Sequence, residues 1–114
     1  NFSIDQAYPV MQNMIQAHPN LKAVFACSDQ MALGAIAAIK DAGKTGQISV
    51  FSFDATDVGL DAVREGTMVG TVAQYPAEMG YKGIEVAIES LTNPNAIFEE
   101  KTYTTVKFLT KEDL

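Results

Sequence analysis

Polar side chains follow three short apolar segments of this sequence. Ser28 and Asp29 follow the first, Asp54 directly follows the second, and Gln74 directly follows the third. Their hydroxyl, carboxylate and amide groups can all form hydrogen bonds with a neutral polar ligand. Catalysis needs a nucleophile or a proton carrier placed beside a partner. Because no lysine, arginine or histidine lies near these positions, the residue types favour binding over catalysis, and we expect no catalytic residue.

Hydrophobic periodicity predicts the elements that carry these residues, as an alternation of helices and strands. The predicted helices are 5–18, 30–42, 57–65 and 76–91, and the predicted strands are 23–26, 48–53, 68–73 and 101–108. Strands joined by helical crossovers are parallel, and right-handed crossovers are expected to place helices on both faces. The expected fold class is therefore α/β, a three-layer αβα sandwich with a mostly parallel sheet.

The carboxyl ends of parallel strands meet at one edge of a sheet, where ligands bind. Structural roles compete with binding at each position. Asp29 precedes a strong helix and is interpreted mainly as its N-cap. Ser28 is equally consistent with a turn, and Gln74 with hydrogen bonding inside a loop. Asp54 is the strongest ligand candidate, because Thr56 and Asp57 can cap the helix that follows it.

Composition excludes several classes of protein. The 114 residues carry a net charge of −6, whereas a nucleic-acid interface needs a basic face, so no nucleic-acid partner is expected. With 47% hydrophobic and 19% charged residues, the chain has the composition of an ordinary globular domain. The single cysteine and single histidine exclude a cysteine-based zinc site and a multi-histidine metal site. No metal and no cofactor are expected.

Several stretches at consistent spacing resemble the type I periplasmic sugar-binding proteins, most closely the ribose-binding group. These stretches are Val10-Met11-Gln12-Asn13-Met14, Ala17-His18-Pro19, Ala23-Val24-Phe25-Ala26, Asp29-Gln30-Met31-Ala32-Leu33-Gly34-Ala35, Ala42-Gly43-Lys44, Phe53-Asp54 and Thr71-Val72-Ala73-Gln74-Tyr75-Pro76. The resemblance covers nearly the whole chain. It implies the C-terminal part, well under half, of a two-lobed protein that closes on a monosaccharide without catalysis and delivers it to an ABC importer, so the three-layer lobe would be incomplete here.

The resemblance also implies a set of ligand contacts. Phe2 takes the place of the aromatic that stacks on the sugar ring, and Asp54 that of the carboxylate that grips two hydroxyls. Gln74 corresponds to the amide beside the hinge. Ser28 stands where ribose binders usually have asparagine, and the serine shortens this contact.

The family pattern further implies how the chain is divided. Residues 1–74 and 103–109 would belong to the C-terminal lobe, and 75–102 to a crossover helix of the other lobe. That helix would lack its partner here, so we expect it to fold back on the sheet or to exchange with a second chain in a domain-swapped homodimer. The implied location is periplasmic, or extracellular and membrane-anchored, with an ABC transporter permease as partner.

Two alternatives remain open at this point. Within the same superfamily, the chain could be the effector-binding domain of a sugar-responsive repressor, or a receptor for a sugar-like signal. In another class, a receiver-like domain could use Asp54 as phosphoacceptor. The lysine that such domains carry just before a proline is missing, since Gln74-Tyr75-Pro76 stands in that place.

Overall fold

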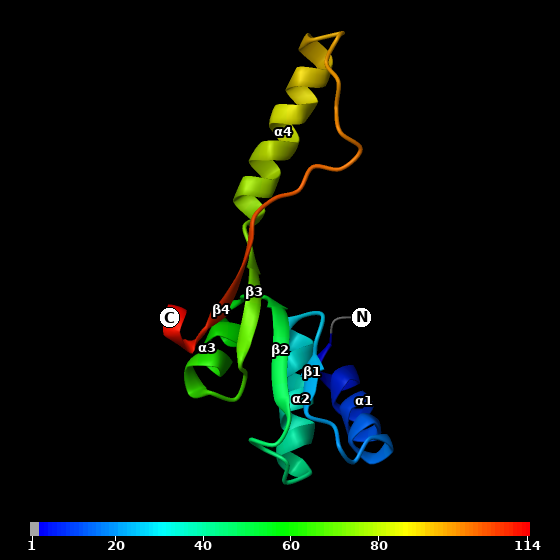
Figure 1. Ribbon diagram of the computed structural model, residues 1–114, viewed down its shortest axis with the longest axis vertical. Coiled ribbons are helices and arrows are strands. Elements are labelled where there is room, and N and C mark those ends of the chain that lie inside the picture. Colours follow the sequence, from blue (N-terminus) through cyan, green and yellow to red (C-terminus); the bar gives the residue numbers. More distant parts are fainter. Residues whose placement is uncertain (1–2) are drawn as a thin grey trace. The chain divides into compact units, whose positions relative to one another are not determined.

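The computed structural model describes residues 3–114, in which helices and strands alternate along the chain (Figure 1). The elements are α1 (Ile4–Ala17), β1 (Ala23–Phe25), α2 (Asp29–Asp41), β2 (Ser49–Asp54), α3 (Asp57–Glu65), β3 (Gly70–Gln74), α4 (Pro76–Thr92), β4 (Val106–Thr110) and the 3-10 helix η1 (Lys111–Asp113). Among the described residues, none of the helices combines the length and apolar character needed to cross a membrane.

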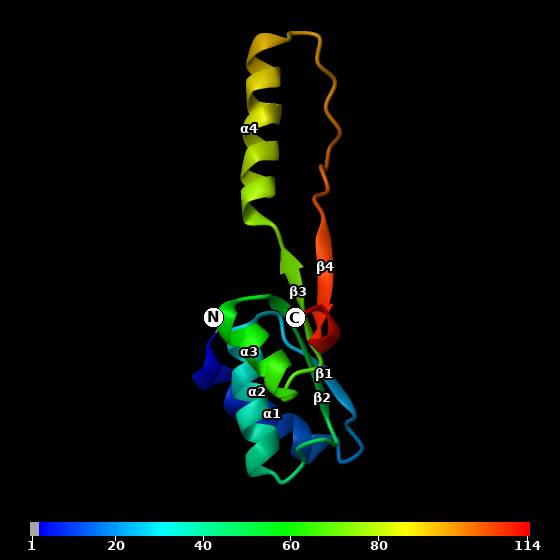
Figure 2. The same cartoon turned by 90° about the vertical axis from the view of Figure 1, so that its left-hand side faces the viewer.

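The four strands form one sheet in the order β1-β2-β3-β4. β1 pairs in parallel with β2, with Phe25 opposite Phe51, and β2 pairs in parallel with β3, with Asp54 opposite Ala73. β4 runs in the opposite direction to β3 (Figure 2). The predicted α/β class with a mostly parallel sheet is therefore confirmed.

The helices α1, α2 and α3 all cover the same face of this sheet (Figure 2). The crossovers α2 and α3 were expected to place helices on both faces, but they lie on one, so the described residues form two of the three expected layers. The reason is the strand order: β1, β2 and β3 follow one another without a reversal. Successive right-handed crossovers that step in the same direction put their helices on the same side.

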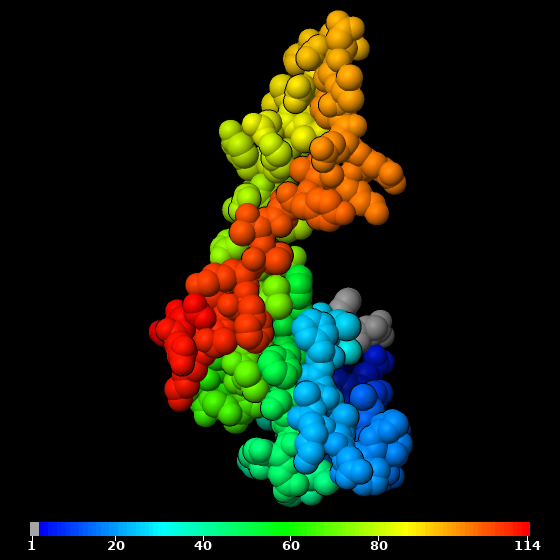
Figure 3. Space-filling model, viewed as in Figure 1, coloured from blue at the N-terminus to red at the C-terminus, as the bar shows by residue number. Residues whose placement is uncertain are grey.

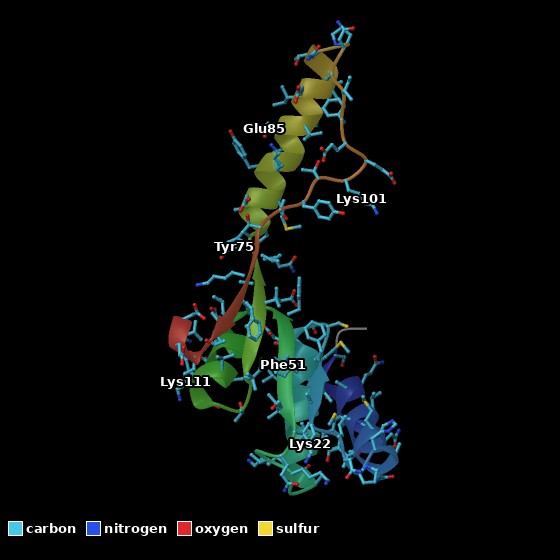
Figure 4. The ribbon with its side chains drawn as sticks, viewed as in Figure 1. Lys22, Phe51, Tyr75, Glu85, Lys101 and Lys111 are labelled. Carbon is cyan, nitrogen blue, oxygen red and sulfur yellow. The ribbon has the colours of Figure 1, made fainter. Side chains whose placement is uncertain are left out.

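The opposite face of the sheet is apolar but open. Phe25 is 60% exposed and Phe108 43% exposed, while Phe51 is half-buried with its ring centroid 6.1 Å from that of Phe108. Figure 3 views this face of the sheet, and Figure 4 labels Phe51 on it. Apolar side chains on both faces are typical of sheets covered on both sides.

The core lies between the sheet and the three helices. Val50 and Met68 are almost fully buried on the sheet side, and Ala32, Ile39 and Val63 are buried on the helices. At roughly 25 cal/mol per Å² of buried apolar surface, this contact is the main stabilising contribution to the fold. It also fixes the ends of β1, β2 and β3 relative to α2 and α3.

The last strand is shorter than predicted and begins later. The alternation predicted a strand at 101–108, but β4 begins at Val106, because an antiparallel partner of β3 can pair only along the residues that β3 provides. The polar tail forms η1, whose Asp113 accepts hydrogen bonds from Lys107 and from the backbone and hydroxyl of Thr110. These bonds lower the pKa of Asp113 to about 2.

The chain divides into two compact units, residues 1–73 with 107–114, and residues 74–106. The second unit contains α4, and no residue of α4 is buried. Ile84, Ile88 and Leu91 are 64%, 56% and 87% exposed. Both expectations for this helix, folding back on the sheet and exchange with a second chain, stay predictions.

We expect the 114-residue chain to be a dimer in solution, because exposed apolar side chains on α4 gain free energy when a second copy covers them. Multi-angle light scattering should give twice the monomer mass of 12.3 kDa. Replacing Ile84 and Ile88 by serine should return the monomer, whereas Glu85→Ser on the same helix should not. A monomeric mass for the unmodified chain would contradict the exchange.

Candidate functional site

The candidate site lies at the edge of the sheet where β1, β2 and β3 end. Asp54 is the last residue of β2 and is paired with Ala73, one residue before the end of β3. β1 ends on the same edge, because the N–H of Ala26 donates to the carbonyl of Phe51 at 2.9 Å. The carboxyl ends of the three parallel strands are thus side by side, as predicted from the sequence. The structure brings the backbone of these strand ends together.

Asp54 occupies an unusual backbone conformation. Its φ is 110° and that of the next residue, Ala55, is 53°, and these are the non-glycine residues with positive φ among those described. Such conformations cost about 1–3 kcal/mol each and persist only where surrounding contacts hold them. Backbone strain of this kind concentrates at binding and catalytic sites, which supports a functional role for this turn.

Asp29 has a different role from the predicted one. The N-cap of α2 is Ser28, whose hydroxyl accepts from the N–H of Met31 at 3.3 Å, so the prediction that Asp29 caps this helix is wrong. Asp29 is the first helical residue and is 0% exposed. A residue so placed points its side chain back toward the sheet, where buried donors surround it.

The Asp29 carboxylate joins β2, β3 and the start of α3. Oδ1 accepts from the hydroxyl of Ser52 and from that of Thr71 at 2.7 Å. Oδ2 accepts from the N–H of Thr56 at 2.7 Å and from its hydroxyl at 2.8 Å. Ser52 and Thr71 are both fully buried, so the carboxylate satisfies them and they satisfy it. Charge-assisted bonds of this kind are stronger than neutral ones.

Two hydroxyls of this network also accept hydrogen bonds. The hydroxyl of Thr71 accepts from the N–H of Ala55 at 3.2 Å. The hydroxyl of Thr56 accepts from the N–H of Gly59 at 3.3 Å, so Thr56 caps α3 as expected. The two peptide N–H groups that follow Asp54 are thus both held by distant side chains. The Ala55 N–H donates to Thr71, and the Thr56 N–H donates to Asp29.

The other predicted ligand residues are placed as follows. Ser28 is 4% exposed, and its hydroxyl is used as the helix cap. Gln74 is the last residue of β3 and is half-buried, as is Asp54. Phe2 lies outside the described residues. No observation tests these residues as ligand contacts, and they remain predictions.

The buried network around Asp29 was not predicted from the sequence. The available signal was the pair of hydroxyl residues Ser52 and Thr71 within otherwise apolar strands. A buried hydroxyl needs a partner, and a carboxylate at the start of the helix after β1 is within reach of both. The N-cap interpretation hid this role, because an aspartate before a helix has the same local pattern.

A separate apolar hollow of about 420 Å³ lies in the first unit between α1, α2 and β1. Val10, Met14, Phe25 and Met31 line it. Neither Asp54 nor Ser28 is among its lining residues, so it is distinct from the candidate site.

Comparison with known proteins identifies relatives of the chain. Residues 1–95 match the family described as the periplasmic binding protein domain. The chain is 49% identical over 78 residues to the ribose import binding protein of Escherichia coli K12, covering 68% of this chain and 26% of that protein. It is 36% identical over 85 residues to the D-allose-binding periplasmic protein of the same organism, covering 75% and 27%.

A solved structure agrees with these relatives. The periplasmic ribose ABC transporter structure from Conexibacter woesei matches with a TM-score of 0.85 and 31% identity, over 98% of this chain and 38% of that one. The chain thus spans between about a quarter and two fifths of the length of these relatives. Because the family model matches most of this chain, the chain belongs to the periplasmic binding protein domain family.

Proposed function

We propose that the chain is the C-terminal part of a longer, two-lobed protein, called the parent protein below, which binds a monosaccharide without catalysis. The observation that carries the proposal is Asp54, held in a strained turn at the carboxyl edge of a parallel sheet. The relatives named for ribose and allose binding support the ligand class.

The residue types suit a sugar. A carboxylate accepts hydrogens from two neighbouring hydroxyls in charge-assisted bonds, and we assign this role to Asp54. Gln74 offers both a donor and an acceptor, and Ser28 offers a hydroxyl. Phe2 would cover the apolar side of the ring. The rest of the parent protein would supply the remaining walls of the binding pocket, since a pocket of this kind encloses most of its ligand.

The division between lobes follows from the same proposal. Residues 1–74 and 103–109 would lie in the C-terminal lobe, with 75–102 contributing to the other lobe. The division of the chain into residues 1–73 with 107–114 and residues 74–106 supports this assignment. The partner of the loaded parent protein would be the permease of an ABC importer, and its location periplasmic or extracellular and membrane-anchored.

The alternatives have less support. The relatives reported above are import or periplasmic proteins by name, and none of those named is a repressor. A receiver-like domain would need a second carboxylate beside Asp54 for magnesium. Asp29 follows the neighbouring strand, but its carboxylate is occupied by Ser52, Thr71 and Thr56.

Isothermal titration calorimetry of the parent protein with D-ribose, D-allose and other monosaccharides tests the proposal. We expect at least one sugar to bind with micromolar or tighter affinity. The 114-residue chain should bind the same sugar at least about 1,000-fold more weakly, because a ligand that loses half its contacts loses roughly half its binding free energy.

Two results would contradict this prediction. One is a parent protein that binds none of the sugars, which would overturn the ligand class. The other is sub-micromolar binding by the 114-residue chain itself, which would overturn the two-lobed site. Circular dichroism of both proteins provides the control for folding.

A further inference from the structure

The strained turn after β2 is held from outside its own strand. Asp54 and Ala55 both have positive φ, which the backbone of a free chain would avoid. The next two contacts along the chain are the Ala55 N–H to the Thr71 hydroxyl and the Thr56 N–H to the Asp29 carboxylate. The conformation of Asp54 therefore depends on side chains from β3 and α2.

The hydrogen bonds of this network form an ordered chain. Thr71 has one hydroxyl hydrogen, which it donates to Asp29, and this leaves its oxygen free to accept from Ala55. The Asp29 carboxylate is an acceptor only, so it fixes the direction in which the Thr71 hydroxyl points. The carboxylate thus acts on the turn directly through Thr56 and indirectly through Thr71.

We infer that Asp29 and Thr71 are positioning residues that hold the Asp54 carboxylate in its ligand-binding orientation. The inference rests on the proposed assignment of Asp54 as a sugar ligand. Asp29 and Thr71 are both fully buried, so their proposed role does not involve contact with the ligand. Their effect on affinity comes from the turn, which in their absence relaxes toward negative φ and turns the carboxylate away.

Ser52 provides a matched control for Thr71. Both hydroxyls donate to the same carboxylate oxygen, and both residues are 0% exposed on adjacent strands. Only Thr71 also accepts from the turn. A role limited to stability predicts similar results for the two residues, whereas a positioning role predicts a loss of affinity only for Thr71.

The experiment compares variants of the parent protein by calorimetry with D-ribose and D-allose, at a temperature where circular dichroism shows each to be folded. Thr71→Val keeps the shape and removes the hydroxyl, and should weaken binding about five- to tenfold, the effect of one hydrogen bond. Thr71→Ser should restore affinity. Ser52→Ala should bind as the unmodified protein does, even if it is less stable.

A double-mutant cycle separates the possible outcomes. If Thr71 acts through Asp54, Thr71→Val should have no further effect on affinity in an Asp54→Ala background. Full loss from Asp54→Ala together with unchanged binding by Thr71→Val would overturn the positioning role alone. Equal losses from Thr71→Val and Ser52→Ala would also overturn it. Unchanged binding by Asp54→Ala would instead overturn the ligand assignment, and the positioning role with it.

Discussion

Asp54→Ala is expected to weaken sugar binding by the parent protein at least about 100-fold. The carboxylate is proposed to accept two hydroxyl hydrogens, and each charge-assisted bond contributes roughly 1.5–3 kcal/mol. Two such bonds correspond to more than two factors of ten in affinity. The measurement is calorimetric titration with D-ribose and D-allose. Asp54 is the residue to change, because it ends β2 opposite Ala73 and has a φ of 110°.

Two further variants make this result specific. Asp57→Ala removes an exposed carboxylate three residues away in the first turn of α3, and should leave affinity unchanged. Asp54→Asn keeps the shape and one acceptor but removes the charge. Its sugar affinity should lie between that of the unmodified protein and that of Asp54→Ala. If Asp54→Ala bound both sugars as tightly as the unmodified protein, Asp54 would not be a ligand residue.

The sequence was sufficient to predict that the strands are parallel and that Asp54 lies at the carboxyl end of β2. β-branched and aromatic runs indicated β2, and turn and capping residues indicated where α3 begins. Thr56 is the N-cap, as expected, which left Asp54 as a carboxylate without a capping role. Local patterns of this kind are short-range and can be recognised in a single chain.

The remaining features depend on relations between distant residues. The placement of the crossover helices α2 and α3 on one face follows from the strand order, which periodicity does not contain. The role of Asp29 depends on Ser52 and Thr71, which lie 23 and 42 residues away. An aspartate at the start of a helix has the same local pattern whether it caps the helix or reaches across the core.

The same network leads to a second large effect, at Gly59. A Cβ atom at this position of α3 would lie 2.7 Å from Oδ1 of Asp29 and closer still to Oδ2. The carboxylate cannot move away, because Ser52, Thr71 and Thr56 hold it. We therefore expect Gly59→Ala to lower the free energy of unfolding by about 2–4 kcal/mol, as overpacking and broken hydrogen bonds outweigh the gain in helix propensity.

Denaturant unfolding of the 114-residue chain, followed by circular dichroism, measures this change. Gly80→Ala in α4 is the matched control, because, apart from its chain neighbours and the backbone of its own helix, nothing lies within 4 Å of the Cβ it would add. That variant should be as stable as the unmodified chain or more stable by up to about 1 kcal/mol, the helix propensity difference between glycine and alanine. If Gly59→Ala behaved like Gly80→Ala, the carboxylate of Asp29 would not be fixed beneath α3. The contacts that hold Thr56 would then be too weak to impose a strained backbone on Asp54.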